Sequence, residues 1–155
     1  MMKTLLINLT FLTFILLFAC SDQSHKIYDE KADMMPVIVE QLKQPNKEIL
    51  LVFGANWCPD CVVFDELLSA KGIKHFIDNE FTVIKIDVGQ EGRNQAAIDA
   101  FENPVNNGIP SIVILDKNGK LKHKTLSGEL AKARDFTKTD MKQFFEDLGY
   151  KIDPS

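Results

Sequence analysis

The stretch that most limits the fold is an unbroken apolar run at residues 49–53, Ile-Leu-Leu-Val-Phe. A strand with one face in water alternates apolar and polar residues, whereas a continuous apolar run is typical of a strand that is covered on both faces. Layers of helix on both sides of a sheet usually provide this cover. The run therefore predicts an α/β fold with a buried central strand.

The other predicted elements follow in an order that fits such a sheet. Helical spacing of apolar residues predicts a helix between Asp33, which can cap it, and Pro45, which ends it. Further helices are expected at 59–71, 94–101 and 139–148, and further strands at 81–88, at 112–115 and from 120 onward. The Asn118-Gly119 pair predicts a hairpin before the last strand. Because the first two crossovers contain helices, we expect their strands to be parallel, with the hairpin adding an antiparallel edge.

Length and charge restrict the class of protein. The chain has 155 residues, which suits one domain with its own core. Apolar residues make up 45% and charged residues 26%, a composition that argues against disordered and fibrous proteins. The net charge is −4 and there is no basic block, so no nucleic-acid partner is expected. Nothing suggests an obligate interface, and we expect a monomer.

The first 19 residues have the pattern of a targeting segment. Lys3 is their only charged side chain, and residues 4–19 form an apolar run that is short for a membrane span of about 20 residues. The run ends in Leu-Phe-Ala-Cys, which resembles the lipobox of bacterial lipoproteins and implies that Cys20 is lipidated and becomes the N-terminus. We therefore expect a signal peptide at 1–19, a tether at 20–30 and one domain at 31–150.

An alternative for this segment is an uncleaved signal anchor in which Cys20 is an unmodified thiol. Both interpretations place the domain outside the cytoplasmic membrane, facing the periplasm or the outer surface of a bacterial cell envelope. The residues after Cys20 do not distinguish an inner-membrane from an outer-membrane location.

Cys58-Pro59-Asp60-Cys61 is the centre of the predicted chemistry. The motif follows the buried strand and opens the next helix, where free N–H groups and the helix dipole stabilise a thiolate and lower its pKa. Pro59 fits the first helical position, because its missing N–H has no partner to lose there. Cys58 is thus the predicted nucleophile with an accessible sulfur, and Cys61, one turn further and shielded, is the predicted resolving thiol.

Three other interpretations of the cysteine pair fit the sequence less well. A zinc site needs two more ligands, and the sequence has no second Cys-x-x-Cys and only His25, His75 and His123, without ligand spacing. A structural disulfide across so short a loop constrains the unfolded chain little. A permanently reduced pair is not expected outside the cytoplasm. No metal or organic cofactor is predicted, because the pair is itself the redox group.

The segment Gly-Ala-Asn-Trp-Cys-Pro-Asp-Cys at 54–61, together with Gly-Ile-Pro-Ser at 108–111, resembles the thioredoxin superfamily, in particular extracytoplasmic thioredoxin-like lipoproteins and thiol reductases. The resemblance covers residues 31–148 and implies a thioredoxin-like fold, with a mixed four-stranded sheet flanked by helices and an extra N-terminal helix. It also implies a cis Ile109-Pro110 peptide beside the cysteines, where the backbone of Ile109 pairs with an extended substrate. Substrate docking is then expected at Trp57, which flanks Cys58, and at Pro59, Asp60, Ile109 and Pro110.

Two positions depart from the family pattern. Val52 stands where cytoplasmic thioredoxins have a buried Asp that helps to deprotonate the resolving thiol, so the proton of Cys61 is expected to go to water or to Glu66. Asp60 favours the helix dipole but repels the Cys58 thiolate, which favours a reductant over a strong oxidant. The sequence assigns no role to residues 89–107 and 127–136.

These features predict a membrane-tethered thiol–disulfide oxidoreductase that reduces or exchanges protein disulfides and serves cell redox homeostasis. The expected partners are protein disulfides and a membrane electron donor such as a DsbD-like transporter, because an oxidising compartment supplies no reductant. The alternatives are a disulfide-donating oxidase or isomerase, a reductant for cytochrome c maturation, and a non-enzymatic lipoprotein that binds extended peptides in the Ile109-Pro110 groove.

Overall fold

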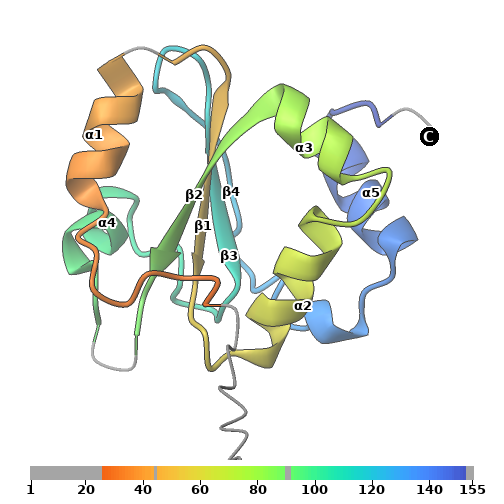
Figure 1. Ribbon diagram of the computed structural model, residues 1–155, viewed down its shortest axis with the longest axis horizontal. Helices are drawn as coiled ribbons and strands as arrows, with labels where there is room; N and C mark the ends of the chain where they lie inside the picture. The colour runs from red at the N-terminus through yellow and green to blue at the C-terminus, as the bar shows by residue number, and fades with distance from the viewer. Residues whose placement is uncertain (1–25, 44, 90–91, 153–155) are drawn as a thin grey trace, which may run out of the picture.

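The computed structural model describes residues 26–43, 45–89 and 92–152 (Figure 1). The predicted signal peptide, Cys20 and half of the tether lie outside these residues. Within the described ranges the elements are α1 (Met35–Lys43), β1 (Glu48–Gly54), α2 (Pro59–Leu68), α3 (Lys74–Glu80), β2 (Phe81–Asp87), α4 (Gln95–Ala100), β3 (Ser111–Leu115), β4 (Leu121–Lys124), the 3-10 helix η1 (Ala133–Asp135) and α5 (Lys138–Asp147). A search of the same ranges finds no helix with the length and apolar character needed to cross a membrane.

The strands form the mixed four-stranded sheet that the sequence predicts. Their order is β2-β1-β3-β4, with β1 parallel to β2, and with β3 antiparallel to both β1 and β4. The extra N-terminal helix is also present as α1. The predicted fold class is therefore confirmed.

The expected parallel direction of the third strand is wrong, since β3 runs antiparallel to β1. The helix in this crossover is too short to reverse the direction of travel. With six residues, α4 rises about 9 Å, whereas the seven-residue strand β2 spans about 23 Å. The chain therefore does not return to the end of the sheet at which β1 and β2 begin. Instead, β3 begins near the end at which β1 and β2 finish, and runs in the opposite direction.

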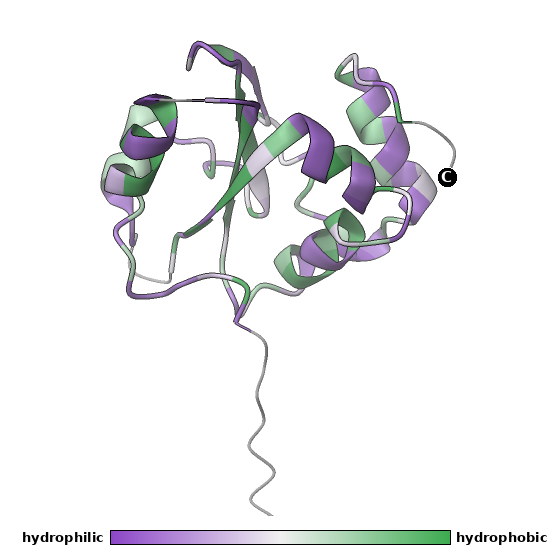
Figure 2. Ribbon diagram, turned by 45° about the horizontal axis from the view of Figure 1, so that its top comes forward, coloured by the Kyte–Doolittle hydropathy of each residue, from purple (hydrophilic) through white to green (hydrophobic). Residues whose placement is uncertain are grey.

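The two faces of the sheet carry separate hydrophobic cores. In β1, Leu50 and Val52 belong to the core beneath α2, α3 and α5, whereas Ile49, Leu51 and Phe53 belong to the core beneath α1 and α4 (Figure 1). Each of these side chains is at most 1% exposed, as the unbroken apolar run predicts. Figure 2 shows the central strands as mainly hydrophobic and the helices as alternating between hydrophobic and hydrophilic residues.

The helix predicted at 59–71 is present as α2, and a further helix, α3, follows it before β2. The first, α2, ends at Leu68, and Gly72 then takes φ = 92° before α3 begins. The sequence analysis did not predict α3, which is short and has no side-chain cap. Its stability comes from tertiary packing, because Phe76 is buried in edge-to-face contacts with Phe81, Phe145 and Tyr150.

Other helix starts are fixed by local side chains. The carboxylate of Asp33 accepts a hydrogen bond from the Met35 N–H at 3.1 Å, as predicted for the cap of α1. Thr137 and Asp140 form a capping box at the start of α5, in which each side chain accepts a hydrogen bond from the other residue's backbone N–H.

Candidate active site

The cysteine pair lies where β1 passes into α2, at the lower end of the sheet in Figure 1. Cys58 is the N-cap of α2 with extended backbone angles, and Pro59 is the first helical residue. The backbone N–H of Cys61 donates to the Sγ atom of Cys58 at 3.2 Å. The sulfur of Cys58 therefore accepts one of the N–H groups that the helix leaves free, as the motif predicts.

Accessibility differs from the expectation for Cys58. Its side chain and backbone together are only 4% exposed, against 0% for Cys61, so the first sulfur is largely covered and the second completely. Pro59 is exposed, and Trp57 is 55% exposed, so the indole is not part of either core. The two residues that flank Cys58 in the chain are therefore exposed, while the sulfur between them is recessed.

The two thiols have opposite electrostatic environments. The hydrogen bond from the Cys61 side chain lowers the pKa of Cys58 to about 7, assisted by the backbone N–H of Cys61 and opposed by burial and by the charge of Asp60. The same contact and burial raise the pKa of the Cys61 thiol. At neutral pH, Cys58 is thus ionised to a large extent while Cys61 keeps its proton.

The Ile109-Pro110 segment closes the site on its other side. Its peptide bond is cis, and the thiol of Cys58 donates to the Ile109 carbonyl with 3.6 Å between sulfur and oxygen. Ile109 is half-buried and Pro110 is buried. The structure thus brings together two segments that are 51 residues apart in the chain, in the arrangement that the sequence resemblance implies.

A family model described as thioredoxin-like matches residues 32–117, more than half of the chain. The chain belongs to this thioredoxin-like family. A solved structure described as a disulphide isomerase from Xylella fastidiosa Temecula1 is 36% identical, with a TM-score of 0.74 over 81% of this chain and 98% of that one. A thioredoxin from Thermus thermophilus is 16% identical, with a TM-score of 0.51 over 74% of this chain and 81% of that one, a likeness of fold alone. Among curated protein sequences, none matches.

Membership of the thioredoxin-like family supports a role for this protein as a thiol–disulfide oxidoreductase. The cysteine pair of the motif is the group in the described part of the chain that can carry this redox chemistry. In the same part of the chain, no cluster of three or more His, Cys, Asp or Glu residues is arranged to hold a metal ion.

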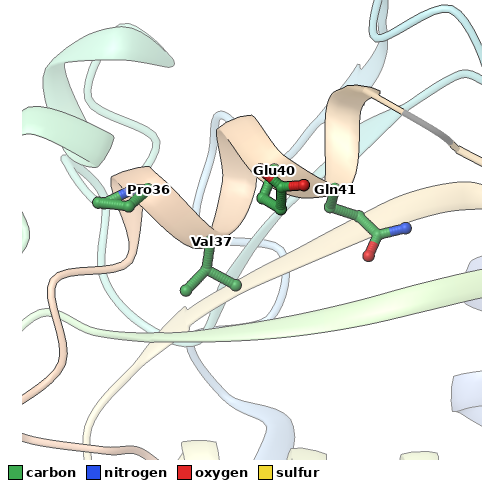
Figure 3. Close-up of a pocket in the computed structure, with 4 residues that line it drawn as sticks. All are labelled: Pro36, Val37, Glu40 and Gln41. Atoms are coloured by element: carbon green, nitrogen blue, oxygen red, sulfur yellow. The ribbon is translucent and has the colours of Figure 1, made fainter.

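A surface hollow lies on α1 and is lined by Pro36, Val37, Glu40 and Gln41 (Figure 3). This helix covers the face of the sheet opposite to the one covered by α2, so the hollow is separate from the cysteine pair.

Asp60 does not have the docking role expected for this thioredoxin-like motif. Its side chain is buried, and it accepts hydrogen bonds from the backbone N–H and the Nε of Arg134, both at 2.9 Å, and from the Arg134 Nη2. The guanidinium holds the pKa of the Asp60 carboxyl below its usual range. The carboxylate therefore fixes a distant segment against α2 and is not available to a substrate.

The structure gives the segment 127–136 a supporting role around the site. Leu130 and Ala133 are buried in the core beneath α2, and η1 carries Arg134 to Asp60. If Gly108 carried a Cβ atom, this atom would lie only 3.0 Å from the Cβ of Ala131. The segment 127–136 therefore packs directly against the loop that leads to Ile109. Arg134 was not among the predicted site residues, because no local sequence pattern marks an ion pair between residues 74 positions apart.

Two residues of the segment 89–107, Arg93 and Asn94, contact Asp87 at the end of β2. Arg93 pairs with the carboxylate of Asp87 at 3.1 Å. The Asn94 side chain donates to the Asp87 carbonyl and accepts from the Met34 N–H, both at 2.8 Å. These contacts tie the polypeptide before α1 to the end of β2.

Glu66 is not placed to take the proton of Cys61, so this expectation is wrong. Five residues along an α-helix correspond to about 140° of rotation, which puts the two side chains on different faces of α2. Accordingly, Glu66 is exposed while Cys61 is fully buried. Val52 is buried in the same core as Cys61 and offers no polar group.

Proposed function

We propose that this protein is a membrane-tethered reductase or exchanger of protein disulfides that acts outside the cytoplasm. The observation that carries the proposal is the asymmetry of the pair, in which Cys58 has a pKa of about 7 and Cys61 is buried with a raised pKa. A thiol with a pKa near the ambient pH combines a useful thiolate fraction with good nucleophilicity. Cys58 is thus suited to attack the substrate disulfide, and Cys61 to remain protonated until the second exchange.

The reaction proceeds in two exchanges. The Cys58 thiolate attacks one sulfur of a substrate disulfide, an S–S bond forms between them, and the other substrate sulfur leaves and takes up a proton. Cys61 then loses its proton and attacks the Cys58 sulfur, which forms the Cys58–Cys61 disulfide and releases the second substrate thiol. Two electrons pass from the pair to the substrate. We infer that a DsbD-like membrane transporter returns them.

Docking in this proposal uses the surface around the recessed sulfur. Trp57 supplies an exposed aromatic ring, and the backbone of Ile109 lies against Cys58, where an extended substrate chain would place its disulfide. Protein substrates with a locally extended cystine segment therefore fit this surface best.

Membrane attachment is the part of the proposal that depends on residues 1–20. The apolar run and its Leu-Phe-Ala-Cys ending support a lipid on Cys20 that holds the domain at the inner or outer membrane, facing the periplasm. Mass spectrometry of the protein from bacterial membranes tests this. A diacylglyceryl modification on an N-terminal Cys20 is the expected result, and an unmodified chain that still begins at Met1 contradicts it.

Trapping tests the proposed exchange. With Cys61→Ala, the mixed disulfide between Cys58 and a substrate protein should accumulate, and with Cys58→Ala it should be absent. The exchange is run at about pH 8.5, where at least about half of Cys58 is ionised even if its pKa rises to the ordinary value, and is then quenched with acid, which stops further exchange. No mixed disulfide in Cys61→Ala refutes the oxidoreductase, and partner binding that survives in Cys58→Ala supports the peptide-binding lipoprotein instead.

A disulfide isomerase is the second candidate, favoured by the 36% identical structure described by that name. An isomerase rearranges substrate disulfides through Cys58 without completing the second exchange, so refolding of a scrambled protein should survive Cys61→Ala. The reduction potential of the pair separates the remaining directions. A reduction potential of about −270 mV indicates a reductant, and one of about −120 mV indicates a disulfide donor.

A further inference from the structure

A buried hydroxyl lies beside the resolving cysteine. Tyr28, in the polypeptide before α1, is 1% exposed, and its hydroxyl has no hydrogen-bond partner among the described residues. Leaving a buried hydroxyl without a partner costs free energy, and native proteins seldom do so. The position of Tyr28 therefore calls for a partner that the resting dithiol does not provide.

Asn56 of the cysteine motif holds Tyr28 in place. The Asn56 Oδ1 accepts from the backbone N–H groups of Ile27 and Tyr28 at 2.9 and 3.0 Å, and its Nδ2 donates to the Tyr28 carbonyl at 2.9 Å. These bonds fix the N-terminal polypeptide across the end of β1, where it runs beneath the sheet in Figure 1. The tyrosine ring is thus anchored by the same loop that carries Cys58.

The missing side chain of Gly54 lets the Tyr28 phenol approach the backbone close to the Cys61 sulfur. A Cβ atom at Gly54 would lie 2.5 Å from the Cζ of Tyr28, closer still to its hydroxyl oxygen, and 3.1 Å from the Sγ of Cys61. The Tyr28 phenol therefore already occupies the place that a side chain at position 54 would take, with the Cys61 sulfur close to the same point, so any larger residue there would clash with the phenol.

The surroundings keep the Tyr28 hydroxyl protonated. Burial, the two cysteines and the carboxylates of Asp65 and Asp87 all raise the pKa of Tyr28. Asp65 is paired with Lys85 and Asp87 with Arg93, although one oxygen of Asp87 has no partner among the described residues. A phenol in this environment donates a hydrogen bond but does not act as a base.

We propose that Tyr28 is a positioning residue for the second exchange, in which its hydroxyl donates a hydrogen bond to the Cys61 sulfur as that sulfur becomes a thiolate. A donor beside a buried thiolate stabilises the charged form that burial alone disfavours. In this step the S–H bond of Cys61 breaks and its proton goes to the departing substrate sulfur. The Cys61–Cys58 bond forms, the Cys58–substrate bond breaks, and Tyr28 keeps its own proton. The inference rests on the proposed thiol–disulfide exchange.

The test uses the aromatic disulfide 5,5′-dithiobis(2-nitrobenzoate), whose coloured thiolate is released once by each exchange. The purified full chain carries Cys20→Ser, so that the signal comes from Cys58 and Cys61 alone. Tyr28→Phe keeps the ring and removes only the hydroxyl. It should leave the first release unchanged and slow the second about 10-fold or more, as expected for one hydrogen bond to a charged group. Tyr150→Phe is the matched control, because that hydroxyl binds Glu48 outside the site.

A second readout separates positioning from a structural role. The pH dependence of the second release follows the ionisation of Cys61 in the Cys20→Ser protein, and adding Tyr28→Phe should move this dependence to higher pH. Thermal unfolding of each variant monitors folding. If the rate of the second release and its pH dependence match those of Tyr150→Phe, the role of Tyr28 is refuted. If the parent protein itself releases no thiolate through Cys58, the proposed function fails instead.

Discussion

Replacement of Cys61 by alanine should raise the pKa of Cys58. The hydrogen bond from the Cys61 side chain is the largest cause of the lowered value of about 7, and Ala removes it while leaving the backbone N–H bond at 3.2 Å. The pKa of Cys58 should therefore rise from about 7 toward the ordinary cysteine value of about 8.5. Cys61→Ser retains an O–H donor at the same place and serves as the matched control.

The size of the effect depends on what is measured. At pH 7, the thiolate fraction would fall from about one half to about 3%, roughly 15-fold. A more basic thiolate is more nucleophilic, with a Brønsted coefficient of about 0.4–0.5, which restores about 5-fold and leaves only about a 3-fold loss of rate. The pH at which the rate is half-maximal is the clearer signal, and it should move up by about one pH unit or more.

Alkylation of Cys58 by iodoacetamide, followed from about pH 5 to about pH 10 in a Cys20→Ser background, measures this midpoint. Cys61→Ala should titrate at higher pH than the parent protein, and Cys61→Ser should stay close to the parent. If Cys61→Ala titrates with the parent, the helix N-terminus alone sets the pKa of Cys58, and the argument from the pair is refuted.

Two further predictions concern residues around the pair. Because Arg134 holds the pKa of Asp60 below its usual range, their ion pair stabilises the fold above the unfolded-state pKa of about 3.9 and is lost as the pH falls through the folded-state value. Asp60→Asn should therefore be less stable at neutral pH and lose less stability on acidification. Urea unfolding at several pH values measures this, and an unchanged pH dependence contradicts it. Trp57→Ala should change the free energy of unfolding by no more than about 0.5 kcal/mol, because the indole is 55% exposed. Trp57→Ala should lower kcat/KM for a protein disulfide but leave the rate with a small aromatic disulfide unchanged. Equal losses with both substrates would contradict a role of Trp57 in docking protein substrates.

Most of the fold could be predicted from the sequence because its signals are local. The apolar run at 49–53, the Asn118-Gly119 turn and the cap at Asp33 each report on backbone geometry within a few residues. The helix α3 escaped prediction because aromatic packing around Phe76, rather than local propensity, stabilises it. The direction of β3 was not predicted correctly, because it depends on how far the six-residue helix α4 brings the chain back along the length of the sheet.

The sequence by itself was enough to predict the chemistry proposed for this protein. Two cysteines three residues apart at the start of a helix predict a thiolate and a resolving thiol, because the helix end and its free N–H groups are set by neighbouring residues. The resemblance at 108–111 added the second segment of the site.

Only the tertiary structure decided what surrounds the sulfurs. It turned Asp60 away from substrates to Arg134, 74 residues later, and placed the hydroxyl of Tyr28 next to Cys61 over Gly54. It also recessed Cys58 beneath the Ile109 carbonyl. Burial, charge pairing and close approach are properties of residues that are distant in the chain, so no local period or motif encodes them, and they emerge only when the chain packs.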